Sequence, residues 1–203
     1  MIITYYGHSC FTLESQGFRV VVDPYRDYVP GYKKLDLEAD AAYCSHGHDD
    51  HCWVQDVTMR ENGAEDPFTV TEIAGFHDDV CGAKRGPNTM RVFEAEGLKV
   101  AHLGDIGCLP PEEDLEKLEG LDACLVPVGG FYTIDAKQAK ELMDLIQPRV
   151  IIPMHYRLGK FGFAEIGELK TFTDLYENVQ FAGSQAIELK ASYPQGVVVL
   201  HCE

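Results

Sequence analysis

The sequence lacks a long hydrophobic segment and is poor in basic residues. No apolar run approaches the roughly eighteen residues that a membrane-spanning helix needs, so we expect no membrane partner. Only 17 Lys and Arg stand against 33 Asp and Glu, which gives a net charge of −16. A chain of this charge repels phosphate backbones, so we expect no nucleic acid partner either. A small-molecule substrate is compatible with the charge, and the sequence leaves open whether the protein is a homo-oligomer.

Paired cysteines and targeting signals are missing as well. The seven cysteines are odd in number and include no Cys-x-x-Cys pair, which favours reduced thiols in a cytoplasmic protein. We interpret Cys52 and Cys108 as small buried thiols. The first eight residues contain no basic region followed by an apolar run, so we expect no secretory signal. No low-complexity tract or linker divides the chain, and we expect a single domain over residues 1–203.

Turn signals and apolar runs predict a mixed α/β chain. Strands are expected over 2–6, 10–14, 18–23, 41–45, 68–73, 90–95, 98–103, 123–126, 150–153 and 197–201. Proline and carboxylates at 110–114 predict a helix that ends at Gly120, and a capping box at Asp135 predicts another that ends at Pro148. An apolar stripe over 166–176 predicts a third helix.

Two segments of the chain resemble each other. Residues 13–20 match residues 93–100 in pattern, and each hairpin then leads to a carboxylate, Asp23 or Asp105. Nearly the same offset relates Asp40 to Asp122, each of which opens an apolar strand. One interpretation is that such hairpins recur by chance. The other is a duplicated unit with a site where the two halves meet.

The strongest motif lies at residues 46–51, which read His-Gly-His-Asp-Asp-His. Four potential metal ligands stand here within six residues, directly after a predicted strand. Imidazole suits zinc and similar divalent ions, and carboxylate adds charge neutralisation. His77, Asp105 and His155 also follow predicted strands. Each alone is more typical of a structural hydrogen-bonding group, but together with the motif they predict a metal site at one sheet edge.

Several further motifs extend this pattern along the chain. They are Gly7-His8-Ser9, Val22-Asp23-Pro24, Gly104-Asp105, Pro127-Val128-Gly129-Gly130 and Ile152-Pro153-Met154-His155-Tyr156. With them the sequence resembles the metallo-β-lactamase superfamily from end to end, and most closely the small beta-lactamase-like metal-dependent hydrolases related to L-ascorbate-6-phosphate lactonase. The resemblance implies a four-layer αββα sandwich built from two pseudo-equivalent halves, with a dinuclear metal site at its edge.

The resemblance also implies roles for individual residues. His46, His48 and His77 would hold one metal ion, and Asp50, His51 and His155 the second, with Asp105 bridging the two. The ions would be Zn²⁺, with Mn²⁺ as the alternative. Asp50 would be the catalytic residue that orients the attacking water or carries its proton. His8 and Asp23 are candidates for orienting ligands, and Tyr132 and Tyr156 for donating to substrate, against ordinary strand-end and packing roles for all four. His102 is expected to point to the other face. Asp49, Asp78 and Asp79 are expected to be solvated.

Two metal ions can generate hydroxide at neutral pH and polarise a substrate oxygen. The sequence therefore predicts a metal-dependent hydrolase that uses a metal-activated hydroxide on a small ester, lactone or phosphorylated metabolite. Two alternatives stay open. One is a phosphodiesterase or nuclease of the same fold, which the net charge disfavours, and the other is a non-catalytic metal-binding protein.

Overall fold

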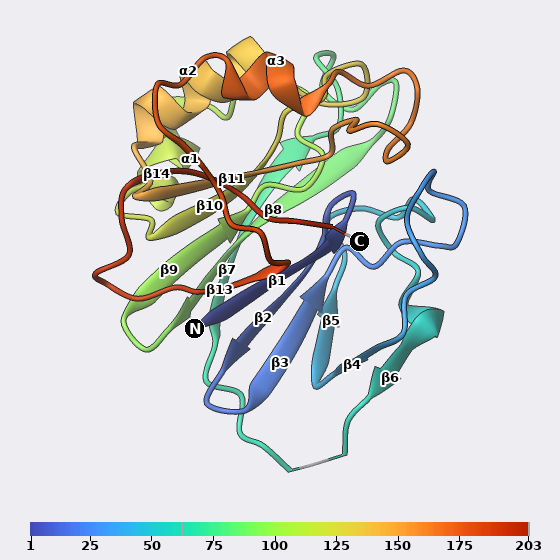
Figure 1. Cartoon of the computed structure of the whole chain (residues 1–203), viewed down its shortest axis with the longest axis vertical. Helices are drawn as coiled ribbons and strands as arrows, with labels where there is room; N and C mark the ends of the chain where they lie inside the picture. The colour runs from blue at the N-terminus through green and yellow to red at the C-terminus, as the bar shows by residue number, and fades with distance from the viewer. Residues whose placement is uncertain (62, 203) are drawn as a thin grey trace.

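Two β-sheets face each other across the main hydrophobic core of the protein, as a computed structural model that describes residues 1–61 and 63–202 shows (Figure 1). The larger sheet has the strand order β12-β14-β11-β10-β9-β8-β7. Its strands are β7 (Thr69–Phe76), β8 (Pro87–Ala95), β9 (Leu98–His102), β10 (Ala123–Pro127), β11 (Val150–Met154), β12 (Val179–Phe181) and β14 (Gly196–Val199).

The smaller sheet has the order β13-β1-β2-β3-β5. Its strands are β1 (Ile2–Gly7), β2 (Cys10–Ser15), β3 (Phe18–Val22), β5 (Ala41–Tyr43) and β13 (Ala186–Glu188). A separate ribbon joins β4 (Leu37–Ala39) to β6 (Val57–Met59) in parallel. All ten predicted strands form. Four further strands, β4, β6, β12 and β13, are not predicted from the sequence, because each is three residues long and too short to show a period-2 pattern.

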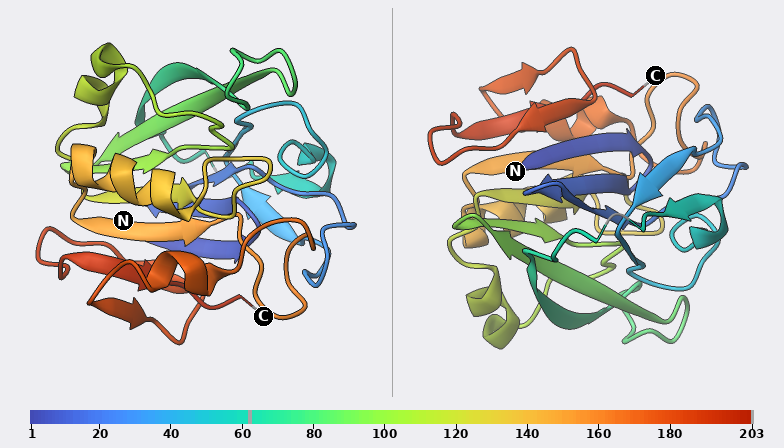
Figure 2. Two further views of the ribbon diagram at one scale, coloured as in Figure 1. Left: turned by 90° about the horizontal axis from the view of Figure 1, so that it is seen from above. Right: turned by 90° about the horizontal axis from the view of Figure 1, so that it is seen from below.

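Helices cover the outer face of the larger sheet (Figures 1 and 2). Helix α2 (Ala136–Ile146) begins as predicted, because the Asp135 side chain accepts from the backbone N–H of Gln138 and the Gln138 side chain accepts from the Asp135 N–H. Its buried face is Ala136, Ala139, Leu142, Met143 and Ile146. The expected apolar stripe therefore packs on the sheet.

The other two predicted helices are shorter than expected. The first is a single turn, α1 (Glu112–Leu115), which tightens into the 3₁₀ turn η2 (Glu116–Leu118). The last is α3 (Leu169–Thr173), which begins three residues later than its apolar stripe suggests. Glu168 is extended instead and forms a β-bridge with Arg157, and the N–H of Gly167 donates to the carbonyl of Gly129 at 2.6 Å. No helix among the described residues is long and apolar enough to cross a membrane.

The layer outside the smaller sheet contains no α-helix in the part of the chain that the structure describes. The loop after β3, the β4–β6 ribbon and the 3₁₀ turn η1 (Val54–Asp56) occupy this region instead. Side chains from this region form a second, smaller core against Cys10 and Val21 on the outer face of the sheet. The expected αββα sandwich is thus confirmed in its two sheets and one helical layer, while the second outer layer is built from loops.

The two halves repeat the same local geometry, which supports the duplicated unit. Hairpins β2–β3 and β8–β9 both turn through two residues with positive φ, at 16–17 and 96–97. The Asp40 carboxylate then accepts from the Arg19 N–H at 2.7 Å, and Asp122 accepts from the Lys99 N–H at 2.8 Å. Each aspartate opens a strand parallel to the second strand of its hairpin, β5 beside β3 and β10 beside β9.

Candidate metal centre

The predicted site residues gather where strands of both sheets end. In the smaller sheet β3 and β5 are parallel, and in the larger sheet β9, β10 and β11 are parallel. Parallel strands present their carboxyl ends at one edge. His8 follows β1, Asp23 follows β3 and His77 follows β7, so residues far apart in the sequence meet at this edge of the sandwich.

The backbone at these strand ends is held in an uncommon conformation. His8, Asp23 and His155 have φ values of 54°, 52° and 52°, a left-handed region that costs a non-glycine residue on the order of 1 kcal/mol. The N–H of His155 donates to the carbonyl of His8 at 2.8 Å, which ties the two sheets together at the site. Such strain persists where the surrounding structure imposes it, as it does at functional sites.

The imidazoles and carboxylates form three overlapping groups. In each group the candidate ligand atoms lie within 4.8 Å of one another. The groups are His46, His48 and His77; His46, His51 and Asp105; and His8, His51 and His155. His46 and His51 each belong to two groups, so the three groups form one continuous cluster. Six of the seven residues predicted as metal ligands fall within this cluster, and the exception is Asp50.

Asp105 lies at the centre of this cluster. Its Oδ2 is 3.2 Å from His51 Nε2, 3.2 Å from His155 Nε2 and 3.5 Å from His77 Nε2. Its backbone N–H donates to Asn88 Oδ1 at 2.8 Å. The loop that carries Asp105 is therefore fixed, and a single carboxylate reaches imidazoles from both sides of the cluster.

Several inward-facing atoms in this cluster have no hydrogen-bond partner. They include His46 Nε2, His51 Nε2 and Asp105 Oδ1, which are all buried. Buried polar atoms in folded proteins are normally satisfied, so each exception calls for an explanation. Imidazole nitrogens and a carboxylate oxygen are the donors that divalent transition metals prefer, and a bound metal ion accounts for all three. The residues present therefore fit a metal site.

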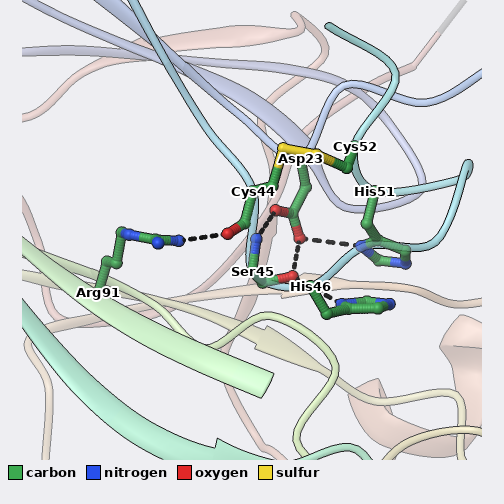
Figure 3. Close-up of a disulfide and its surroundings, with 7 residues drawn as sticks. All are labelled: Asp23, Cys44, Ser45, His46, His51, Cys52 and Arg91. Atoms are coloured by element: carbon green, nitrogen blue, oxygen red, sulfur yellow. Dashed lines mark hydrogen bonds and ion pairs between the residues drawn. A yellow bond between two sulfur atoms is a disulfide. The ribbon is translucent and has the colours of Figure 1, made fainter. Parts of the chain in front are cut away.

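The Asp23 carboxylate orients His46 and His51, the two histidines that each belong to two of the groups (Figure 3). Its Oδ2 accepts from His51 Nδ1 at 2.9 Å and from the Ser45 hydroxyl at 2.6 Å, and its Oδ1 accepts from the Ser45 N–H at 2.6 Å. The Ser45 hydroxyl in turn accepts from His46 Nδ1 at 2.9 Å. Because both Nδ1 atoms are used in this way, the Nε2 lone pairs face the cluster. Asp23 thus contacts His51 as its predicted orienting role requires, and Ser45 is a supporting residue that the sequence does not predict.

A disulfide joins Cys44 to Cys52 and closes the segment that contains the histidine motif (Figure 3). The carbonyl of Cys44 also accepts from the Arg91 guanidinium at 2.6 Å. The prediction of seven reduced thiols is therefore wrong for this pair, and Cys52 is not a free thiol. The sequence separation of eight residues matches none of the short cysteine motifs, which is why the pairing was missed. Cytoplasmic localisation stays a prediction, and the argument from reduced cysteines no longer supports it.

Burial and charge set opposite protonation preferences within the cluster. Burial and the neighbouring His155 lower the pKa of His8 to about 4, and burial with His51 lowers the pKa of His46 to about 3. Burial works against ionisation of Asp105, but His155 and His51 outweigh it and hold the pKa of this carboxyl well below its usual range. Burial likewise lowers the pKa of His51, yet Asp105 and Asp23 raise it well above its ordinary value.

Asp50 and His8 form a pair beside the cluster. The Asp50 Oδ2 lies 3.3 Å from His8 Nε2 and 3.9 Å from His51 Nε2. The His8 ring centroid is 4.3 Å from that of His155 and 4.9 Å from that of His51. Asp50 therefore reaches the cluster at its half-buried rim, and His8 lies closer to the histidines than its predicted orienting role requires.

The two candidate tyrosines lie in different surroundings. The ring of Tyr132 is 6.4 Å from that of His155, and its carbonyl accepts from His77 Nδ1 at 3.1 Å. Tyr156 is buried instead, with its ring 6.4 Å from that of Tyr5 in the main core. The structure thus brings Tyr132 to the cluster but gives Tyr156 a packing role. A polar residue after a strand can face either side, and the sequence did not distinguish the two cases.

Three further polar residues are placed by contacts that the sequence does not reveal. His102 points away from the cluster, as expected, with Nε2 2.9 Å from the Ser9 carbonyl. Asn88 Nδ2 donates to the Leu103 carbonyl and supports the Asp105 loop. Asp78 is buried rather than solvated, because its carboxylate accepts from four backbone N–H groups of the following loop. These bonds outweigh its burial and lower its pKa to about 2.

Comparison with known families agrees with this geometry. The family described as the beta-lactamase superfamily domain matches residues 2–155. The chain belongs to the beta-lactamase superfamily. Among its relatives in this superfamily is a UPF0173 protein from Pyrococcus abyssi, 30% identical over 81% of this chain and 88% of that protein. A UPF0173 metal-dependent hydrolase from Carboxydothermus hydrogenoformans is 27% identical over 84% of this chain and 91% of that protein.

A solved structure from Thermotoga maritima extends the similarity to the whole fold. It is described as a candidate Zn-dependent hydrolase of the metallo-beta-lactamase superfamily, and it is 33% identical with a TM-score of 0.79. The match covers 100% of this chain and 99% of that one. Together with the histidine and aspartate cluster, these relatives support a metal-dependent hydrolase of the beta-lactamase superfamily.

Proposed function

We propose that this protein is a metal-dependent hydrolase with two divalent ions, which acts on a small ester, lactone or phosphorylated metabolite. The observation that carries the proposal is the position of Asp105. One oxygen of this carboxylate lies within 3.5 Å of His51, His77 and His155, and the other oxygen is buried without a partner. A carboxylate so placed suits a bridge between two ions, each with its own set of imidazoles.

The first set is one of the overlapping groups, and the second takes two histidines of another group with Asp50 in place of His8. We assign His46, His48 and His77 to the first ion, and His51 and His155, with Asp50 at the rim, to the second. Imidazole-rich ligands favour Zn²⁺, and Mn²⁺ is the alternative. Asp23 supports this division, because it orients His51 directly and His46 through the Ser45 hydroxyl.

Bound divalent ions would lower the pKa of a shared water and polarise the substrate oxygen. The protein's own side chains supply the rest. Asp50 is the charged group at the rim, and its Oδ2 is held by His8 Nε2 at 3.3 Å. From this position it orients the attacking water or accepts its proton. The substrate enters beside exposed His48, where the site opens to solvent.

Metal analysis tests the assignment directly. We expect about two equivalents of zinc or manganese in the purified protein by plasma mass spectrometry, and a loss of metal in His48→Ala. His201→Ala is the matched control, because this histidine is exposed and belongs to none of the ligand groups. A His48→Ala protein with full metal content would contradict the ligand set, and wild type that binds only one ion would contradict the dinuclear site.

Turnover tests the reaction class. We expect the metal-loaded protein to hydrolyse members of a panel of lactones and aryl esters faster than bis(4-nitrophenyl) phosphate, and Asp50→Asn to lose this activity. Preference for the phosphodiester would favour the phosphodiesterase alternative, against which the net charge of −16 argues. A fully metallated protein without any turnover would instead favour the non-catalytic alternative.

A further inference from the structure

Arg85 is an exception among the arginines of this chain. The other six each form an ion pair with a carboxylate, as expected where acidic residues outnumber basic ones by 33 to 17. Among the described residues, no carboxylate lies within ion-pair distance of the Arg85 guanidinium. The side chain is half-buried, so its charge is partly removed from water without an internal counter-charge.

The acidic residues beside Arg85 are already occupied. Asp78 accepts from the backbone N–H groups of Val80, Gly82, Lys84 and Arg85 at 2.8–2.9 Å. Asp79 pairs with the Lys84 ammonium at 2.9 Å. The loop therefore neutralises its own carboxylates and leaves the Arg85 charge uncompensated. Because Asp78 directly follows His77, the same contacts tie the position of Arg85 to the histidine cluster.

A cavity of about 430 Å³ lies beside this guanidinium. Its lining includes Arg85, Lys84, Tyr132 and Gln138, together with Asp78 and Asp79, whose carboxylates are engaged in the contacts just described. The Arg85 Cζ is 5.3 Å from the centroid of the Tyr132 ring, and that ring is 6.4 Å from the His155 ring. Tyr132 thus stands between the cavity and the metal cluster. The Gln138 Oε1 accepts from the Asp135 N–H, which leaves the Gln138 amide N–H groups as donors for a ligand.

We propose that this cavity binds an anionic group of the substrate, a phosphate or a carboxylate, through Arg85 with the help of Gln138. A planar guanidinium pairs with either anion through two parallel hydrogen bonds, and it stays charged at all physiological pH values. The bond to be cleaved would then lie on the far side of Tyr132, at the histidine cluster. The inference rests on the proposed hydrolase function and names its substrate class as anion-bearing esters or lactones.

Calorimetry on the metal-loaded protein tests anion binding without turnover. The probes are inorganic phosphate and succinate, and the variants are Arg85→Gln, Arg85→Lys and the control Arg60→Gln. Arg60 is a matched control because it pairs with Asp40 at the start of β5, whereas the metal cluster lies at the other end of this strand. We expect Arg85→Gln to lower the affinity for one of the two anions roughly 10- to 100-fold. Arg85→Lys should lower this affinity less, and Arg60→Gln should leave it unchanged.

The anion that is affected identifies the ligand group as phosphate or carboxylate. If Arg85→Gln binds both anions as tightly as wild type, or if wild type binds neither, the proposal is overturned.

Kinetics with two matched esters test the same group during catalysis. 4-Nitrophenyl acetate is neutral, and mono-4-nitrophenyl succinate has the same leaving group with a free carboxylate. For a carboxylate site we expect Arg85→Gln to raise KM for the succinate ester alone, with little change in kcat. If calorimetry identifies a carboxylate site, equal effects on both esters would contradict its role in catalysis while leaving the hydrolase function intact. If wild type hydrolyses neither ester, the ester part of the proposed function fails, and calorimetry still decides the role of Arg85.

Discussion

The disulfide between Cys44 and Cys52 encloses the segment with the histidine motif, and replacing both cysteines by serine would measure its contribution to stability. In the chain-entropy description, a disulfide stabilises a protein by restricting the unfolded chain. The sequence separation here is eight residues. A loop of this size corresponds to about 2.5 kcal/mol at 25 °C. For a chain of about 200 residues, such a loss lowers Tm by roughly 5–10 °C.

We expect this loss to affect stability far more than metal binding. In the folded state, the loop is held independently of the disulfide by the bonds from Asp23 to His51 and Ser45, and by the His51 N–H, which donates to the His48 carbonyl at 2.9 Å. The ligands should therefore stay in place after the disulfide is removed. The double variant should be less stable and still bind its full complement of metal.

The assay is urea unfolding of the metal-free protein in excess chelator, because bound metal would add its own stabilisation. Wild type with a dithiol reductant should unfold at the same urea concentration as Cys44→Ser/Cys52→Ser. The control is Cys81→Ser/Cys108→Ser, which replaces two free cysteines and should leave the midpoint nearly unchanged. Equal midpoints for wild type and the disulfide variant without reductant would refute the reasoning. So would a reductant effect of the same size in both proteins.

Two other predictions concern residues that support the cluster. Asp23→Asn should lower metal affinity roughly 10- to 100-fold, measured by competition with a chromogenic chelator, because it weakens the hold on His51; unchanged affinity would exclude the orienting role. Asp78 has its pKa lowered to about 2 in the folded state, so its stabilising effect is present above about pH 4 and lost as the pH falls through 2. Asp78→Ala should therefore unfold more easily at pH 7, and its stability should fall less between pH 4 and 2 than that of wild type. Parallel acid profiles for the two proteins would contradict this.

The metal cluster was predictable where ligands stand close together in the sequence or directly follow a strand. The motif at 46–51 needs only a tight loop, and His77, Asp105 and His155 mark strand ends that a parallel arrangement brings to one edge. The place of His8 was less clear, because one histidine after a hairpin strand can face either sheet. Its contacts with Asp50 and His155 depend on how the two sheets pack.

The supporting residues were not predictable, because their partners are distant along the chain. Asn88 acts through a side-chain contact to the backbone of Asp105, 17 residues away. Cys44 and Cys52 show no recognised cysteine spacing, and their pairing needs the loop to fold back on itself. Arg85 looks like any surface cation until the six other arginines are seen to be paired.

By itself, the sequence determined the family, the two sheets with their repeated hairpins, and the ligand types at the metal centre. Hydrophobic periodicity, turn residues and closely spaced ligands are local signals, and they act over a few residues. The tertiary structure alone decided that Asp50 lies at the rim of the cluster, that Tyr156 is buried while Tyr132 faces the cluster, and that Arg85 has no ion-pair partner among the described residues. These features depend on distances between residues far apart in the sequence, which only the folding of the chain brings together.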